Sequence, residues 1–117
     1  MYIFAYLVGP CITSFSRPCT FQAKDLARNI KGFDRKDWES VAESIMERGL
    51  VEKFYQNPSA RMFLKGTGSA LIAEASRHDQ FWGIGLDIQD PNITDTEKWQ
   101  GANNLGALLM RVREKLS

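Results

Sequence analysis

Residues 37–58, "DWESVAESIMERGLVEKFYQNP", carry the strongest secondary-structure signal in this sequence. Apolar side chains recur at three- to five-residue spacing, which predicts an amphipathic helix from a cap at Asp34 or Asp37 through about Gln56. Its apolar side comprises Trp38, Val41, Ala42, Ile45, Met46, Leu50 and Phe54. Glutamates at 39, 43 and 47 are expected to face solvent. The Asn57-Pro58 pair predicts that a second helix restarts with Asn57 as its N-cap and ends at Gly66.

Shorter segments flank this helix. Residues 1–8, "MYIFAYLV", are rich in aromatic and β-branched side chains, which predicts a buried strand. Residues 69–75 fit either a short strand or a helical turn, and residues 86–98 form a polar loop. Residues 103–116, "NNLGALLMRVREKL", predict a further amphipathic helix whose cations Arg111, Arg113 and Lys115 face water.

Length and composition indicate one ordinary globular domain. The 117 residues include 15 Lys and Arg against 14 Asp and Glu, so the net charge of +1 demands no polyanionic partner. Cys11 and Cys19 are interpreted as reduced thiols of a cytoplasmic protein, and no zinc site is expected beside the single histidine, His78. The apolar start is far shorter than the roughly 20 residues of a membrane span, so no membrane association is expected.

The octapeptide "HDQFWGIG" (78–85) places a carboxylate, a large flat ring and two glycines close together. One interpretation is a turn that carries an aromatic residue. The other is a pocket in which Trp82 stacks on a flat ligand and Asp79 acts on it. No phosphate-binding loop, metalloprotease motif or Ser/His/Asp set accompanies this segment.

Three ordered stretches give the sequence a specific resemblance: residues 37–58, "FLKGTGSALIAEASRHDQFWGIG" (63–85) and "KWQGANNLGALLMRVREKL" (98–116). Together they strongly resemble the NADAR/YbiA-like family over residues 34–116. The resemblance implies an α+β fold, a helix-rich single domain over residues 1–117 with a small β component. It also implies an N-glycosidase without a metal or redox cofactor. The implied substrates are ribosylaminopyrimidine phosphates of riboflavin synthesis or ADP-ribosylated guanine in nucleic acids.

Site roles follow from this resemblance and from the chemistry of the bond. Cleaving a C1′–N bond builds positive charge on ribose, so a carboxylate at Asp79 would stabilise the transition state. Trp82 would form a wall of the pocket, and glycines at 83 and 85 would let the backbone approach the ligand. Asn103 would bind ribose or phosphate oxygens. Trp38 matches a functional tryptophan of the family.

Each assignment has a structural alternative. Asp79 could serve only as a turn residue, and Trp82 and Trp38 could be core residues. Asn103 could be only the N-cap of the last helix. Glu74, which matches a family glutamate, could be a buried structural carboxylate paired with Lys53 or Arg113.

Residues 1–33 are divergent and shortened relative to the family pattern. "SFSRPC" (14–19) and "TFQAKDL" (20–26) resemble its two ends, but the intervening segment is missing. The family's catalytic glutamate would fall near Arg17 or Pro18 and is absent. Lys24 is the candidate for the family's Schiff-base lysine, one residue earlier than the pattern places it. The chain is therefore interpreted as a diverged glycosidase, a non-catalytic ADP-ribose or nucleotide-binding module, or an inactive truncated family member.

Overall fold

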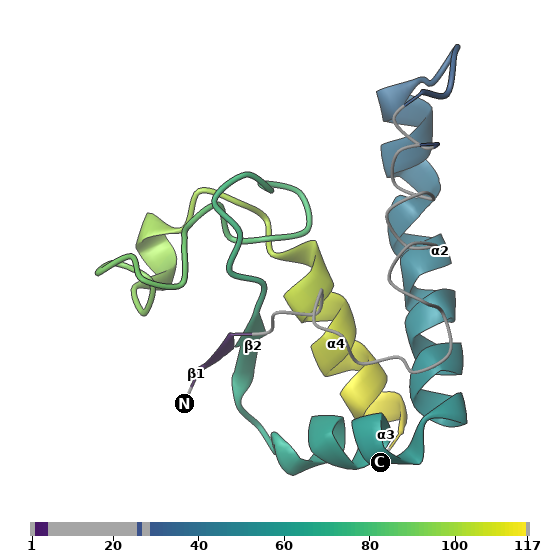
Figure 1. The fold of residues 1–117 in the computed structure, drawn as a ribbon. Coiled ribbons are helices and arrows are strands. Elements are labelled where there is room, and N and C mark those ends of the chain that lie inside the picture. The colour runs from purple at the N-terminus through teal and green to yellow at the C-terminus, as the bar shows by residue number, and fades with distance from the viewer. Residues whose placement is uncertain (1, 5–25, 27–28, 117) are drawn as a thin grey trace.

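The computed structural model describes residues 2–4, 26 and 29–116. In chain order, the elements are β1 (Tyr2–Phe4), α2 (Arg35–Gln56), α3 (Pro58–Gly66), β2 (Leu71–Ala73), the 3₁₀ turn η1 (Thr96–Lys98) and α4 (Asn104–Lys115). Figure 1 shows α4 between β2 and the C-terminal half of α2, with α3 joining the two at one end. The described residues are thus mostly helical, as the resemblance implies.

The small β component is a pair of parallel strands. Tyr2 is opposite Leu71, Ile3 opposite Ile72 and Phe4 opposite Ala73. The strand predicted at the start of the chain is therefore confirmed for Tyr2–Phe4, and the ambiguous segment 69–75 contains a strand rather than a helical turn.

The long helix α2 begins where its capping residue predicts. The Asp34 carboxylate accepts hydrogen bonds from the backbone amides of Lys36 and Asp37, and the helix then runs for 22 residues. Its predicted apolar side is only half right. Ala42, Leu50 and Phe54 are buried, whereas Trp38, Val41 and Ile45 are 41–50% exposed. The N-terminal end of α2 extends beyond the other described elements in Figure 1, and Trp38, Val41 and Ile45 belong to neither core cluster of the described residues.

The junction of α2 and α3 differs from the prediction in two details. Asn57 precedes α3, but its side chain does not cap that helix. Instead, its amide donates to the Lys53 carbonyl at the end of α2. Gly66 is the last residue of α3. The glycine with left-handed backbone angles that follows the end of this helix is Gly68, with φ of +59°.

Strand β2 separates two hydrophobic clusters because successive side chains of a strand point to opposite faces. Ile72 belongs to the larger cluster, formed with α2, α3 and α4; its other buried members are Leu50, Phe54, Leu64, Leu108, Leu109 and Val112. Ala73 belongs to a smaller cluster with Ala75, Ile84, Leu86 and Ile93, which come from the loops after β2. The loop that carries the candidate site therefore has a core of its own.

Polar contacts of α4 correct two further predictions. Arg113 does not face water: it is 9% exposed and donates to Thr67 Oγ1 at 2.8 Å and to the Ala70 carbonyl at 2.9 Å. Glu47 does not lie on a free solvated face. Its carboxylate pairs with Arg111 and Lys115 across the α2–α4 contact, and its side chain is 18% exposed.

This ion-pair cluster makes stability depend on pH. The hydrogen bond from Lys115, with the charges of Lys115 and Arg111, holds the pKa of Glu47 below its ordinary value of 4.5. A carboxylate whose pKa is lowered on folding stabilises the fold above its unfolded pKa, and this contribution is lost as pH falls through the folded value. We expect Glu47→Gln to lower the melting temperature at neutral pH, with a difference from wild type that shrinks below pH 4.5.

Thermal melts across that range measure the effect, and Glu43→Gln, exposed on the same helix, should melt like wild type throughout. A Glu47→Gln deficit that stays constant into acid would mean that the carboxylate does not act through its charge.

No helix in the described part of the chain is long and apolar enough to cross a membrane.

Candidate functional site

The octapeptide 78–85 folds as a turn organised by Asp79. The Oδ1 atom of this half-buried residue accepts hydrogen bonds from the backbone amides of Phe81, at 3.0 Å, and Trp82, at 2.7 Å. Asp side chains commonly close turns in this way. Asp79 is therefore a turn residue, and this role is compatible with a second role for the same carboxylate in chemistry.

Trp82 is partly buried and packs against the larger core cluster. Its ring also meets Phe81 edge to face, with ring centroids 4.8 Å apart and an interplanar angle of 85°. The core role considered for Trp82 is thus part of what holds the ring in place. If Trp82 also binds a ligand, the ligand would contact the part of the ring that this packing leaves exposed.

A second segment, residues 100–105, holds this turn in place through backbone hydrogen bonds and is called the clamp below. Every backbone N–H in it donates to a carbonyl of residues 80–84, at distances of 2.8–3.3 Å. The segment includes the first amides of α4, which in many helices stay free to bind anions. Here Asn104 donates to Phe81 and Leu105 donates to Trp82, so these helix-end donors hold the turn instead.

The two glycines of the turn are explained by packing within the protein. A Cβ atom on Gly83 would lie 2.8 Å from the Asp79 carbonyl oxygen and 3.0 Å from that of Glu74. Gly85 has φ of +73°, and a Cβ there would meet Gln100 at 3.0 Å. The close backbone approach that these glycines permit is thus between protein segments, and their approach to a ligand stays a prediction.

Asn103 connects the clamp to the strand. It is 6% exposed and has left-handed backbone angles, with φ of 52° and ψ of 39°. Its Oδ1 accepts from the Glu74 amide and its Nδ2 donates to the Ile72 carbonyl, both at 3.0 Å. Asn103 occupies the N-cap position of α4, where its carbonyl accepts from the Ala107 amide, but its side chain makes no capping hydrogen bond. Substrate binding by Asn103 stays a prediction.

Glu74 lies next to this turn. It is 8% exposed, and its carbonyl accepts from the Ile84 amide at 2.9 Å. The carbonyl oxygens of Glu74 and Asp79 both lie within 3.0 Å of the point where a Gly83 Cβ would stand. The fold therefore brings the backbones of two carboxylate residues together although they are separated in sequence.

The remaining candidate residues are not assembled with this turn in the described part of the chain. Lys24 lies outside the described residues. Trp38 is 41% exposed near the start of α2 and belongs to neither core cluster. Its match to a functional tryptophan of the family stays a prediction.

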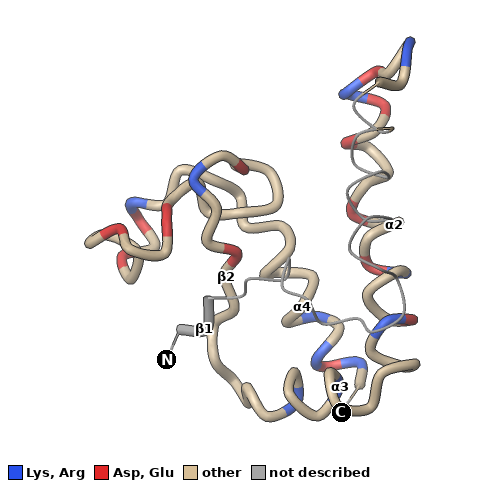
Figure 2. Tube along the Cα trace, in the orientation of Figure 1, with Lys and Arg blue, Asp and Glu red and all other residues tan. Residues whose placement is uncertain are grey.

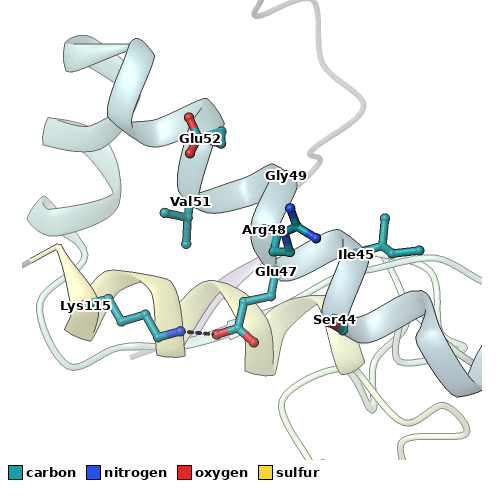
Figure 3. A pocket seen from close by; sticks show the side chains of 8 residues that line it. All are labelled: Ser44, Ile45, Glu47, Arg48, Gly49, Val51, Glu52 and Lys115. Carbon is teal, nitrogen blue, oxygen red and sulfur yellow. Dashed lines mark hydrogen bonds and ion pairs between the residues drawn. The ribbon is translucent and has the colours of Figure 1, made fainter.

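A groove of about 490 Å³ lies on α2 and is shown in Figure 3. Glu47 and Lys115 meet on its wall, and it is otherwise lined by Ser44, Ile45, Arg48, Gly49, Val51 and Glu52. None of the candidate site residues that the structure describes lines it. The groove is therefore separate from the turn built around Asp79.

In Figure 2, α2 carries charges of both signs, whereas the charged residues of the loop 86–98 are four carboxylates followed by Lys98. In that loop region, Arg77 lies 3.6 Å from Asp87, and Lys98 lies 3.5 Å from Asp95. Among the residues that the structure describes, no group of three or more His, Cys, Asp or Glu side chains is placed to hold a metal ion.

A family model of the NADAR domain matches residues 12–117, which include strand β2, the turn around Asp79 and the clamp. The chain belongs to the NADAR family. The resemblance carried by the three sequence stretches is thereby confirmed.

Among NADAR relatives, Protein irg-1 of Caenorhabditis elegans is 43% identical over 81 residues, which are 69% of this chain and 38% of irg-1. N-glycosidase R617 of Acanthamoeba polyphaga mimivirus is 38% identical over 104 residues, 89% of this chain and 60% of R617. N-glycosidase YbiA of Shigella flexneri serotype 5b is 36% identical over 95 residues, 81% of this chain and 52% of YbiA. The chain thus spans 38–60% of the length of these relatives.

Sequence reasoning missed the clamp and the burial of Arg113. A usable signal was present for the clamp, because "GANNLG" (101–106) is rich in small residues that allow backbones to approach. Arg113 carries no such signal, because the polar groups that it binds lie more than 40 residues away in sequence.

Proposed function

We propose that this chain is an N-glycosidase of the NADAR type, which cleaves the bond between a base or amino nitrogen and ribose or ADP-ribose. The observation that carries the proposal is the Asp79–Trp82 turn, where a carboxylate and an aromatic ring are held by backbone hydrogen bonds from residues 100–105. Such prior fixation is what transition-state stabilisation requires. Relatives named N-glycosidases support the same reaction class.

In the proposed reaction, the C1′–N bond breaks with its electron pair on nitrogen. The leaving nitrogen takes up a proton, and water adds to C1′ and loses its proton. The Asp79 carboxylate stabilises the cation that develops on ribose. Trp82 holds the base or sugar against its ring, and the backbone at Gly83 and Gly85 shapes the wall.

A second carboxylate is needed for efficient proton transfer, and Glu74 is the described acid whose backbone lies beside Asp79. Lys24 is proposed as the amine that bonds to C1′ in place of water as the base leaves; the ribose ring then opens to give a Schiff base, and water hydrolyses that Schiff base to release the sugar and the free amine. Borohydride trapping with ADP-ribose, followed by peptide mapping, would locate any such adduct.

The second candidate function is non-catalytic binding of ADP-ribose or a nucleotide. It is favoured by a specific observation: Asp79 Oδ1 already serves two backbone amides, so part of the carboxylate is committed to the turn. A binding module would retain the aromatic wall without turnover.

The test incubates the chain separately with ADP-ribosylated guanine DNA and with ribosylaminopyrimidine phosphate, and measures released base by chromatography. Release of base from either substrate supports the glycosidase and names its substrate class. The absence of release from both, together with micromolar binding of ADP-ribose by calorimetry, would replace the glycosidase with the binding module.

Trp82→Ala is expected to weaken ADP-ribose binding roughly tenfold or more, because stacking of a base on an aromatic ring contributes about 1–3 kcal/mol. Trp82→Phe keeps a flat ring and should lose less affinity. Calorimetry gives the affinities, and thermal melts show whether packing against the core has been lost. Normal affinity in a destabilised Trp82→Ala protein would assign Trp82 to the core alone.

A further inference from the structure

Asn103 is the one non-glycine residue with positive φ in the described part of the chain. This conformation is unfavourable for most side chains, and asparagine tolerates it better than others. A strained backbone persists where the surrounding contacts require it, and such positions concentrate at functional sites. The contacts of Asn103 show what the strain provides.

The side-chain amide of Asn103 forms hydrogen bonds with the backbone at the C-terminal end of β2. It accepts from the Glu74 amide and donates to the Ile72 carbonyl, so it bonds on both sides of Ala73. All four residues are buried. Turning the amide toward a ligand would leave two buried backbone groups without these hydrogen bonds, which is unfavourable because buried polar groups need partners.

The backbone of Asn103 forms a hydrogen bond with the Asp79–Trp82 turn at the same time. Its amide donates to the Gly83 carbonyl at 3.0 Å, next to Trp82, whose own amide binds Asp79. The Glu74 carbonyl accepts a hydrogen bond from the Ile84 amide, so the residue after β2 is also bonded directly to the turn. One residue therefore joins the strand, the turn and the start of α4.

We propose that Asn103 is a positioning residue that fixes the Asp79–Trp82 turn against Glu74 and does not itself bind substrate. Its part in catalysis rests on the proposed glycosidase function, whereas its part in holding the turn does not. The proposal replaces the direct contact with ribose or phosphate oxygens expected from the family resemblance.

Steady-state kinetics distinguish positioning from binding. Asn103→Gly keeps the left-handed backbone accessible but removes both side-chain hydrogen bonds. We expect its kcat to fall on the order of tenfold to 100-fold, with KM changed less than about threefold, because misplacement of the turn affects the transition state most. Asn92→Gly, the same substitution on the exposed loop 86–98, should retain wild-type kinetics. A rise in KM and in the Kd for ADP-ribose with unchanged kcat would overturn the proposal.

Hydrogen–deuterium exchange tests the same proposal without turnover. In Asn103→Gly, the amides of Glu74 and Trp82 should exchange faster than in wild type, because one loses its acceptor and the other its fixed turn. Wild-type protection at both amides in this variant would refute positioning. Absence of turnover in the wild type would refute the glycosidase but leave this comparison valid.

The wild-type protein supplies a test that does not depend on the variant folding. If Asn103 only positions the turn, the Glu74 amide should stay protected when ADP-ribose is added at saturating concentration. If the Asn103 amide turns to bind the ligand, the Glu74 amide loses its acceptor and exchanges faster. Faster exchange at Glu74 with ligand would show that Asn103 is a binding residue and end the positioning proposal.

Discussion

Asp79→Asn is expected to lower kcat on the order of 10²–10³-fold, the usual effect of removing one group that stabilises a transition state. Asparagine retains an Oδ1 atom that can accept from the amides of Phe81 and Trp82, so the turn should persist. The variant loses only the negative charge that opposes the cation on ribose. Because that cation is absent in the ground state, KM should change little. Initial rates over a range of substrate concentrations measure both constants.

Asp87→Asn is the matched control for this substitution. Like Asp79, Asp87 accepts a hydrogen bond from a backbone amide through Oδ1. The donor is Gln89, and the pair lies on the exposed loop after the turn. It should therefore retain wild-type kcat. A near-normal kcat in Asp79→Asn would show that the carboxylate is structural and that "HDQFWGIG" is a turn that carries an aromatic residue.

Gly106→Ala is expected to destabilise the fold by roughly 3–5 kcal/mol, through overpacking and loss of buried hydrogen bonds. A Cβ at this position would overlap the Ile72 carbonyl oxygen and both polar atoms of the Asn103 side chain. The helix α4 could then no longer approach β2 closely enough to keep those bonds. Helix propensity alone predicts the opposite sign, since alanine is favoured over glycine inside a helix by about 1 kcal/mol. Denaturant unfolding measures the change.

Gly49→Ala provides the opposing control. Gly49 lies within α2, and a Cβ there would meet no described atom within 4 Å outside the backbone of its own helix. We therefore expect this variant to gain about 0.5–1 kcal/mol from propensity. If Gly106→Ala were equally stabilising, the close contact of α4 with β2 would not exist in solution.

The sequence by itself determined the features that depend on neighbours along the chain. Asp34 caps α2 through amides two and three residues away, and Pro58 starts α3 directly after α2 ends. The period of the apolar residues predicted α2 and α4, and the apolar start predicted the strand at Tyr2–Phe4. The ordered motifs indicated the NADAR family. Capping and periodicity act within one or two helical turns, so they can be recognised without knowledge of the rest of the fold.

The tertiary structure alone decided which polar groups meet. Asn103 binds backbone groups 29 and 31 residues earlier, and Arg113 binds a hydroxyl 46 residues earlier. Local pattern placed Arg113 in water, because periodicity reports which face a residue occupies but not what covers that face. For Asn103 the sequence offered a substrate-binding role or a helix cap, and neither one identifies the backbone groups that its side chain binds. Local pattern also grouped Trp38 with the apolar side of α2, although Trp38 is 41% exposed and the end of α2 that carries it extends beyond the other elements. Burial and hydrogen-bond partners depend on contacts between distant segments, and these contacts exist only once α4 has packed against β2 and the turn.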